Sequence, residues 1–435
     1  MDQSNMDLND TDQNEMDLIA DLEARGLIQD STDRAFLRAR VQDGPVGIYY
    51  GCDPTADSLH VGNLIGLIVL RRFQDAGHRA IALAGGATGM VGDPGGRSEE
   101  RNLLDDATLS SNVAAIKAQL GRIVDLSDPE RGVLVDNRDW TSGISLLEFL
   151  RDVGKHVTVN QMMARESVKI RLESEHGISF TEFSYMLLQA NDYLWLHDHL
   201  DCHIQIGGSD QWGNIVSGVD LIRRKRQVAV HAFSWPLLKA SDGSKLGKTT
   251  GARTWLDPAK TSPYQFRQHF MQVADENVRA QLMAFSLRSV AEIESVLATH
   301  AEAPHERSAQ RTLAHDVTAL VHGEAAAVAA DEAADVLFGG DPSAASVAGL
   351  EAVSAEVPSS RMTPVQLDDL IGALVATGLA TSNSDARRTL DGSGYRCNGT
   401  VLEANSQLSD HAMLHGRYLL LQRGKKSHHL VEVFP

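Results

Sequence analysis

The sequence has few cysteines and no long hydrophobic run, and each shortage excludes a class of protein. Three cysteines (Cys52, Cys202 and Cys397) among 435 residues are too few and too scattered for a disulfide framework, so we expect a reducing, cytoplasmic location. No stretch of about 18 apolar residues is present, so no transmembrane helix is expected. The N-terminus lacks the basic and apolar regions of a secretory signal, and none is expected.

Basic residues are also scarce. The chain has 40 Lys and Arg against 58 Asp and Glu, and its net charge of −18 argues, taken alone, against a nucleic-acid partner. The charge is unevenly distributed, however. Residues 1–33 hold ten acids and one base, which is half of the net charge, whereas residues 365–435 hold seven of each. The basic run at 223–226 is typical of a solvated helix end, but it also suits an RNA backbone.

Short apolar segments alternate with helical patterns in the first half of the chain. The segments expected to be strands are 46–50, 79–86, 133–135 and 203–206. This alternation predicts an α/β fold, with an open parallel sheet covered on both faces. Because such sheets bind ligands at the carboxyl ends of their strands, the loops that follow the strands are the candidate site.

The chain divides by composition into five parts. They are an acidic disordered tail at 1–15, a parallel-sheet domain at 16–257 with a helical insertion at about 140–200, an all-helical domain at 258–340, a small-residue linker at 341–364, and a compact α+β unit at 365–435.

Residues 51–63 (GCDPTADSLHVGN) predict a turn from a strand into a helix that begins near His60. Helix N-termini present free N–H groups and positive partial charge, which suits phosphate. The alternative is an ordinary capped turn, with Asp57 or Ser58 as the N-cap and His60 as a surface residue.

Residues 239–250 (KASDGSKLGKTT) resemble a phosphate-binding P-loop but lack its first glycine, because position 242 is Asp. What remains is a loop whose two lysines, Lys245 and Lys248, can follow a polyphosphate; the alternative is a solvated basic loop. The glycine-rich segments 85–97 and 205–214 are each weak evidence of a ligand, since either can be a simple turn.

The segment 197–203 (HDHLDCH) has the composition of a metal site. Zinc ligands usually come in pairs from two separated segments, and no second pair follows here. We therefore interpret it as a polar helix end that enters a strand.

Taken together, GCDPTADSLHVGN, GGATGMVGDPGG, YMLLQAND, QIGGSDQWGN and KLGKT resemble, in order and spacing, the bacterial tyrosyl-tRNA synthetases. The resemblance spans roughly residues 18–435. It implies a class I synthetase with a Rossmann-like catalytic domain, an all-helical anticodon-region domain and a small α+β RNA-binding domain of the S-four type. It also implies a homodimer that uses L-tyrosine, ATP with Mg²⁺ and tRNA(Tyr), without a protein metal site.

The resemblance also implies roles for residues that match the family's motifs. Catalytic roles fall on Thr55, His60, Arg97, Arg101, Lys245, Lys248 and Thr249. ATP binding falls on Gly51, Asp53, His60, Gly62, Asn63, Gly208, Asp210 and Lys248. Tyrosine binding falls on Tyr49, Asp93, Tyr185, Gln189, Asp192 and Gln211, with Tyr49 and Asp192 at the phenolic hydroxyl. From the basic runs we expect tRNA contacts at Arg223, Arg224, Arg387, Arg388, Arg423 and Lys425.

The sequence departs from the family at two positions near the expected nucleotide. Asn63 stands where many relatives have a second histidine, and Tyr50 stands where the residue is often small. Three alternatives stay open: a tryptophanyl-tRNA synthetase, a catalytically decayed RNA-binding regulator, and an enzyme that forms an adenylate for an acceptor other than tRNA.

Overall fold

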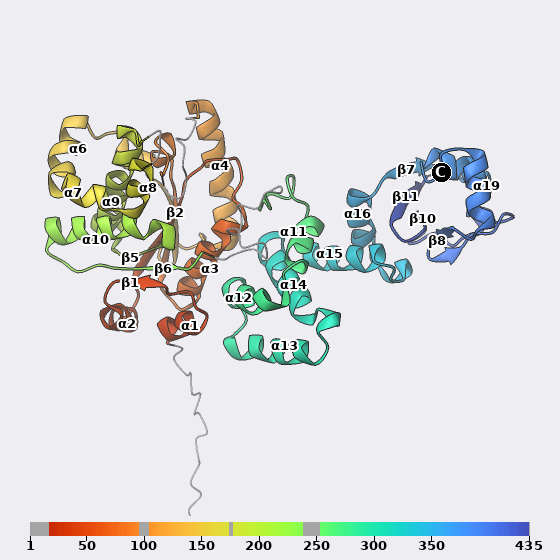
Figure 1. Ribbon diagram of the computed structural model, residues 1–435, viewed down its shortest axis with the longest axis horizontal. Helices are drawn as coiled ribbons and strands as arrows, with labels where there is room; N and C mark the ends of the chain where they lie inside the picture. The colour runs from red at the N-terminus through yellow and green to blue at the C-terminus, as the bar shows by residue number, and fades with distance from the viewer. Residues whose placement is uncertain (1–16, 95–103, 174–176, 238–252, 435) are drawn as a thin grey trace, which may run out of the picture. The chain divides into compact units, whose positions relative to one another are not determined.

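The structure is a computed structural model that describes residues 17–94, 104–173, 177–237 and 253–434. These residues form two compact units (Figure 1). The first unit holds the residues up to 237 together with Leu287–Glu294, and the second holds residues 253–286 and 295–434. Among the helices of the described ranges, none is long and apolar enough to cross a bilayer.

The first unit is built on a six-stranded sheet in the order β1-β6-β5-β2-β3-β4. The strands from β2 to β6 are parallel, and only β1 is antiparallel to its neighbour. The bounds are β1 (Asp30–Ser31), β2 (Gly47–Cys52), β3 (Arg79–Ala84), β4 (Gly132–Asp136), β5 (Cys202–Gly208) and β6 (His231–Trp235). The four predicted strands are thus confirmed, and with them the α/β class.

The sequence did not reveal β6, whose segment HAFSW mixes polar with apolar side chains. All five residues are nevertheless buried, because β6 lies between β5 and β1. Buried His231 and Ser234 break the apolar run by which a central parallel strand is normally recognised.

Helices cover both faces of this sheet, as expected. α9 (Phe180–Leu200) and α10 (Trp212–Arg226) pack on the face that carries Tyr49 and Ile81. α3 (Val61–Asp75) and α4 (Asp106–Ile123) contact β2, β3 and β4, and Tyr50 meets α3 at Gly66. The shorter helices are α1 (Leu18–Ala24), α2 (Arg34–Gln42), α5 (Arg138–Thr141), α6 (Leu146–Asp152), α7 (Val159–Met163) and α8 (Glu166–Leu172).

The strand order fixes where a ligand can bind. The chain passes from β2 to β3 and β4 on one side, and then returns to β5 and β6 on the other side of β2. The connection after β2 runs to β3 on one side, whereas the strand on the other side of β2 is β5. In sheets of this kind a ligand binds in the crevice at the carboxyl ends of the two strands where the order reverses, here β2 and β5. The loops that carry Asp53 and Asp210 follow these two strands.

The second unit begins with the expected helices. Their bounds are α11 (Pro263–Met271), α12 (Asp275–Phe285), α13 (Val290–Glu302), α14 (Ser308–His322) and α15 (Glu324–Leu337). α11 and α14 pack against each other, and α15 packs on both.

A five-stranded sheet, in the order β7-β11-β10-β8-β9, forms the C-terminal part. Its strands are β7 (Ser359–Met362), β8 (Tyr395–Cys397), β9 (Thr400–Val401), β10 (Tyr418–Arg423) and β11 (Ser427–Val433), and its helices are α17 (Pro364–Leu367), α18 (Leu370–Ala376) and α19 (Asn383–Asp391). The expected small α+β unit is therefore present.

The segment 341–364 is not the simple linker that its composition predicts, because it contains α16 (Val347–Glu356) and β7. β7 pairs with β11, and α16 packs against β10 and β11 through a buried cluster that includes Leu350, Val353, Leu420 and Leu430. The prediction was wrong because the small residues around Leu350 and Val353 obscured their helical spacing.

Candidate active site

Tyr49 on β2 and Asp192 on α9 are both buried in the first unit. Tyr49 is buried on β2, and its hydroxyl has no hydrogen-bond partner among the described residues. Burial, and then the carboxylate of Asp192, raise the pKa of Tyr49 well above its usual range, so its phenol stays neutral. A buried hydroxyl beside a carboxylate, with no protein partner, favours a polar group of a ligand at this place.

Asp192 of α9 is held by two N–H donors from the segment that follows β4. Asn137 Nδ2 donates to Asp192 Oδ2 at 2.9 Å, and Trp140 Nε1 donates to Oδ1 at 2.8 Å. Burial raises the pKa of Asp192 to about 7, although these two hydrogen bonds lower it. The carboxylate is therefore rigidly placed and close to its titration point near neutral pH.

A second set of hydrogen bonds joins the amino-acid half of the site to the nucleotide half. The Tyr185 hydroxyl donates to Asp53 Oδ2 at 2.8 Å, and the Thr88 hydroxyl donates to Asp53 Oδ1 at 2.8 Å. Asn137 Nδ2 also lies 2.9 Å from Thr88 Oγ1, which connects this set to Asp192. Asp53, expected at ATP, thus touches Tyr185, expected at tyrosine.

Asp93 supplies a third carboxylate. Gln211 Nε2 donates to Asp93 Oδ2 at 2.5 Å, and Asn214 Nδ2 lies 3.3 Å from Oδ1. Gln189 on α9 has a buried Oε1 without a hydrogen-bond partner among the described residues. Acceptors on Asp93 and Gln189 suit an ammonium group, which carries three donors.

His60 is the N-cap of α3, so the alternative that placed the cap at Asp57 or Ser58 was wrong. Gly62 N–H donates to His60 Nδ1 at 3.0 Å, and His60 N–H donates to Asn63 Oδ1 at 3.1 Å. Because Nδ1 accepts a hydrogen bond, the proton of the neutral ring is on Nε2, which is a donor. The two hydrogen bonds form a reciprocal capping box, in which Asn63 caps the backbone N–H of His60 at the start of α3.

Two glycines in the ligand-side loops are required sterically. A Cβ on Gly85 would lie 2.3 Å from Asp53 Oδ1, and one on Gly208 would lie 2.7 Å from Asp210 Oδ1. Each glycine therefore lets the backbone approach a carboxylate that lines the crevice. Three further expected ATP-side residues, Gly51, Thr55 and Asp210, are exposed at the carboxyl edge of the sheet.

Five expected catalytic residues lie outside the described residues. They are Arg97, Arg101, Lys245, Lys248 and Thr249.

The run Arg223–Arg226 ends α10, as the helix-end interpretation predicts. Arg224 donates to the backbone carbonyl of His156 and to Gln161 Oε1, and Arg226 forms an ion pair with Asp198. Arg223 stays 66% exposed beside Asp220. Arg224 and Arg226 thus hold the helical insertion and α9 in place, which leaves Arg223 as the member best placed for a partner.

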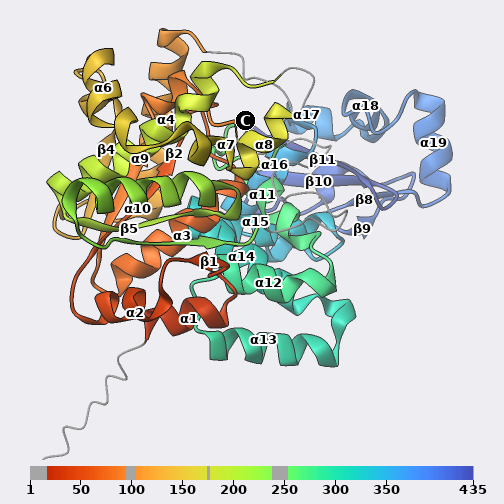
Figure 2. The same ribbon diagram turned by 60° about the vertical axis from the view of Figure 1, so that its left-hand side comes forward.

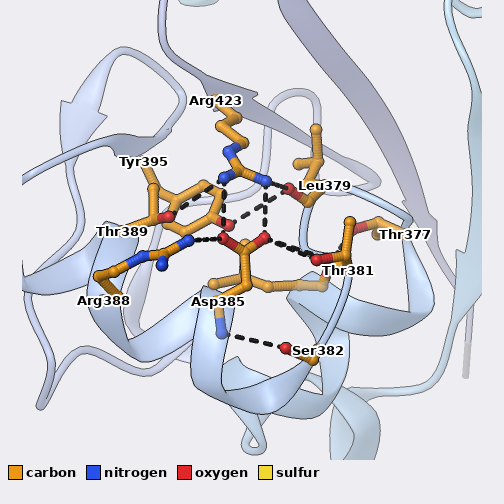
Figure 3. A network of polar contacts seen from close by, with 10 residues as sticks. Thr377, Leu379, Thr381, Ser382, Asp385, Arg388, Thr389, Tyr395 and Arg423 are labelled. Atoms are coloured by element: carbon orange, nitrogen blue, oxygen red, sulfur yellow. Dashed lines mark hydrogen bonds and ion pairs between the residues drawn. The ribbon is translucent and has the colours of Figure 1, made fainter.

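Arg423 is also occupied within the protein (Figure 3). Its two terminal nitrogens bond Asp385 Oδ2 at 2.9 Å and Oδ1 at 3.0 Å, and one of them also donates to the Leu379 carbonyl at 2.7 Å. The bidentate pair lowers the pKa of Asp385 far below its usual range. Arg388 touches the same carboxylate but remains 82% exposed, and Arg387 and Lys425 are exposed too.

The segment 197–203 is the predicted helix end and strand start, since α9 ends at Leu200 and β5 begins at Cys202. His197 Nδ1 lies 3.1 Å from the Cys202 carbonyl, and His203 Nε2 lies 2.9 Å from Asp201. Within the described ranges, no group of three or more His, Cys, Asp or Glu residues has the arrangement of a metal site.

Four polar residues of the site were not expected from the sequence, namely Thr88, Asn137, Trp140 and Asn214. Asn137 comes directly after β4 and therefore lies at the ligand edge of the sheet. Its position after a predicted strand was a usable signal. Trp140 had no such signal, because one turn of helix separates it from the strand end.

Two family models match the chain. A model described as class I tRNA synthetases (W and Y) matches residues 42–339, and a model for the SYY-like C-terminal domain of tyrosine–tRNA ligases matches residues 349–431.

Similar proteins carry consistent names. The tyrosine–tRNA ligase of Opitutus terrae is 48% identical over 426 residues, which are 96% of this chain and 100% of the relative. That of Kineococcus radiotolerans is 49% identical over 414 residues, 94% of this chain and 97% of the relative. Among solved structures, a C-terminally truncated mitochondrial tyrosyl-tRNA synthetase of Aspergillus nidulans matches with a TM-score of 0.67 and 33% identity, over 74% of this chain and 94% of that one.

Proposed function

The chain belongs to the class I tRNA synthetases of the tryptophan and tyrosine group, and we propose that its crevice is where tyrosine and ATP react. Its activity is that of a tyrosine–tRNA ligase. Tyrosine and ATP give tyrosyl-adenylate and pyrophosphate, and the tyrosyl group then passes to the 3′-terminal ribose of tRNA. The match of both halves to tyrosine–tRNA ligases favours this activity over the tryptophan-specific, regulatory and other-acceptor alternatives.

The phenol end of tyrosine is assigned to Tyr49 and Asp192. The observation that carries this assignment is the buried, unpartnered Tyr49 hydroxyl beside a carboxylate fixed by Asn137 and Trp140. A substrate hydroxyl can donate to the carboxylate and accept from Tyr49. Phenylalanine would leave both groups unpaired, which is costly in a buried site.

The ammonium end is assigned to Asp93, Tyr185, Gln189 and Gln211. Asp93 and Gln189 offer acceptors, while Tyr185 and Gln211 hold the carboxylates of Asp53 and Asp93 in place. This arrangement points the tyrosine carboxylate toward the N-terminus of α3. A carboxylate is already a nucleophile, so the protein need only align it and stabilise charge on the leaving group.

The ATP is assigned to the first turn of α3 and the loops around it. His60 Nε2–H and the helix N-terminus can stabilise the phosphates, and Thr55 is exposed beside them. The nucleoside is assigned to Gly51, Asp53, Gly62, Asn63, Gly208 and Asp210. From the sequence we assign the departing pyrophosphate to Lys245, Lys248, Thr249, Arg97 and Arg101. Mg²⁺ enters as part of the substrate, bound to ATP.

The tRNA is assigned to the exposed cations. Arg387, Arg388 and Lys425 on the C-terminal unit and Arg223 on α10 are exposed. Arg423 and Arg224 are engaged in intramolecular contacts, so we assign them a structural role.

A homodimer is supported by exposed apolar side chains on α6, α7 and the start of α9, which are helices of the first unit (Figures 1 and 2). This apolar insertion surface consists of Leu146, Leu147, Leu150, Val159, Met163 and Phe180. Exposed apolar patches of this kind mark interaction sites. The three cysteines are free and buried, which agrees with a cytoplasmic location.

Tyrosine-dependent ATP–pyrophosphate exchange, repeated with tryptophan and phenylalanine and followed by charging of total tRNA, tests the proposal. Exchange with tyrosine alone and charging of tRNA are expected. Exchange that prefers tryptophan would overturn the assignment of Tyr49 and Asp192, and exchange without charging would overturn the tRNA acceptor.

A further inference from the structure

α4 contacts α3, and none of its residues has a role in the assignments above. The buried face of α4 is apolar apart from two side chains, Asn112 and Gln119, which are 5% and 6% exposed. They are two helical turns apart and therefore lie on the same side of the helix. A buried amide side chain normally has hydrogen-bond partners, so the partners of these two indicate their role.

Both amides bond the loop that joins β2 to α3. Asn112 Nδ2 donates to the Pro54 carbonyl at 3.1 Å. Gln119 Oε1 accepts from the Leu59 N–H at 2.8 Å and from the Ser58 hydroxyl at 3.3 Å. Because loop residues lack the regular pairing of a strand or a helix, their buried backbone groups need other partners. The two amides of α4 supply partners at both ends of the loop.

The Pro54 end of the loop is also held by packing. Pro54 is buried, and a Cβ on Gly89 would lie 2.9 Å from its Cδ and 3.1 Å from Cδ1 of Leu109 on α4. Gly89 thus lets the segment after β3 approach both Pro54 and α4 closely. Thr55, the next residue of the loop, is exposed, so its position depends on where Pro54 is held.

The Leu59 end of the loop leads directly into α3. Ser58 and Leu59 are buried, and the next residue is His60, the N-cap of α3. The hydrogen bond from the Leu59 N–H to Gln119 fixes the peptide unit that precedes this cap. α4 therefore holds the residues that stand immediately before Thr55 and His60.

We propose that Asn112 and Gln119 are positioning residues for the reaction of ATP, which fix the two ends of the loop and so hold Thr55 and His60 in place for the phosphates. The proposal rests on the proposed function, because it takes this loop and the α3 N-terminus to be the place where ATP binds. Both amides are buried and act through the backbone of the loop. Their loss should therefore affect the step that uses ATP and leave the affinity for tyrosine unchanged.

Steady-state pyrophosphate exchange and equilibrium binding of tyrosine with Gln119→Met test the first anchor. Methionine fills a similar volume but offers only a weak sulfur acceptor, so the Leu59 N–H loses its partner. The kcat/KM for ATP should fall roughly tenfold, as expected for a small displacement of groups that act on the phosphates. The dissociation constant for tyrosine should not change. Gln119→Glu keeps an oxygen acceptor at the same place and should restore most of the loss.

Asn112→Leu tests the second anchor, because leucine has nearly the same size as asparagine but no donor for the Pro54 carbonyl. It should lower kcat/KM for ATP by a similar factor, again with tyrosine binding unchanged. The two variants sit at opposite ends of the loop, so they report on its position independently.

Gln74→Met is the matched control. Gln74 is fully buried on α3, and its amide bonds the backbone of Asp125 at 2.7 and 2.8 Å and the carbonyl of Arg131 at 3.0 Å. These residues precede β4, so they lie at the edge of the sheet opposite to the candidate site. Gln74→Met should lower the free energy of unfolding as Gln119→Met does, but leave the exchange constants as in the wild type.

Wild-type exchange constants in Gln119→Met or Asn112→Leu would overturn the positioning role. An equal loss of exchange in Gln74→Met, weaker tyrosine binding in either α4 variant, or no recovery in Gln119→Glu would also overturn it. If Gln119→Met does not fold, the comparison of Asn112→Leu with Gln74→Met decides. Absence of tyrosine-dependent exchange in the wild-type protein would instead overturn the proposed function.

Discussion

Lowering the pH through 7 should weaken tyrosine binding, because Asp192 then takes up a proton. Burial raises the pKa of this carboxyl to about 7, against the lowering effect of Asn137 and Trp140. Only the ionised form offers acceptors to both of these N–H groups and to the phenol of tyrosine together. If that form alone binds, the dissociation constant for tyrosine should rise roughly tenfold for each pH unit below 7.

The same shift determines the sign of an effect on stability. A carboxyl whose pKa is higher in the folded chain stabilises the fold while protonated, and this stabilisation is lost as the pH rises through the folded pKa. For Asp192 the rise from 3.8 to about 7 corresponds to roughly 4 kcal/mol. Asp192→Asn cannot ionise, so its free energy of unfolding should increase relative to wild type between about pH 4 and pH 7. At every pH in this range Asp192→Asn also loses a constant free energy of unfolding of about 1–3 kcal/mol, because its side-chain amide faces another buried N–H.

Equilibrium binding of tyrosine, measured from about pH 6 to pH 8 in wild type and in Asp192→Asn, is the assay. The affinity for ATP, measured over the same range in both proteins, is the control, because Asp192 is assigned to tyrosine and not to ATP. Urea unfolding at the same pH values measures the stability difference. A wild-type affinity for tyrosine that does not change with pH, or a dependence that survives in Asp192→Asn, would refute the reasoning.

Three further outcomes are expected. Arg423→Ala should lower the melting temperature of the C-terminal unit, because it removes two charge-assisted hydrogen bonds to Asp385 and one to the Leu379 carbonyl (Figure 3), whereas exposed Arg387→Ala should not; calorimetry measures both. Burial lowers the pKa of His315, but its hydrogen bond to Asp331 at 2.7 Å outweighs this effect, and the pKa is raised overall. The stabilisation of the fold by this pair is therefore present at acidic pH and is lost as the pH rises through the raised pKa. Urea unfolding at about pH 6 and pH 8 should therefore show a smaller effect of His315→Phe at the higher pH. Leu147→Glu should convert a dimer into a monomer, measured by light scattering, because it puts a charge on a leucine that is 78% exposed in the apolar insertion surface; an unchanged mass would remove Leu147 from the dimer interface.

Much of the fold could be predicted because each element satisfied a local rule. β2 and β3 are apolar runs that end at a glycine, and α3 starts at a turn and stops at Gly77, so periodicity and breakers sufficed. β6 and α16 were missed for opposite reasons. β6 has polar residues that become buried only when it pairs between two strands, and α16 is hidden by small residues that pack on a sheet formed far along the chain.

The candidate site was predictable at the ends of strands and at the helix start, where a motif and a position agree. The helix start near His60 was confirmed, and only the alternative N-cap at Asp57 or Ser58 was wrong: Asp and Ser are the usual capping residues, while here the His60 ring nitrogen accepts the hydrogen bond. Two of the basic residues predicted as RNA contacts, Arg224 and Arg423, have partners within the protein that the sequence did not reveal. Composition counts charges, whereas the position of Asp385 decides that Arg423 is neutralised inside the protein.

The sequence by itself determined the class of fold and the order of the motifs, because these follow from residue types at fixed spacing along the chain, and the resemblance of those motifs to tyrosyl-tRNA synthetases predicted the reaction. The tertiary structure decided which polar groups meet. Asp192 lies 55 residues after Asn137 in the sequence, yet their side chains are 2.9 Å apart, and this contact orients the carboxylate, while burial raises its pKa to about 7. Burial and long-range contacts, rather than residue identity, therefore decide which arginines are engaged within the protein and which stay exposed.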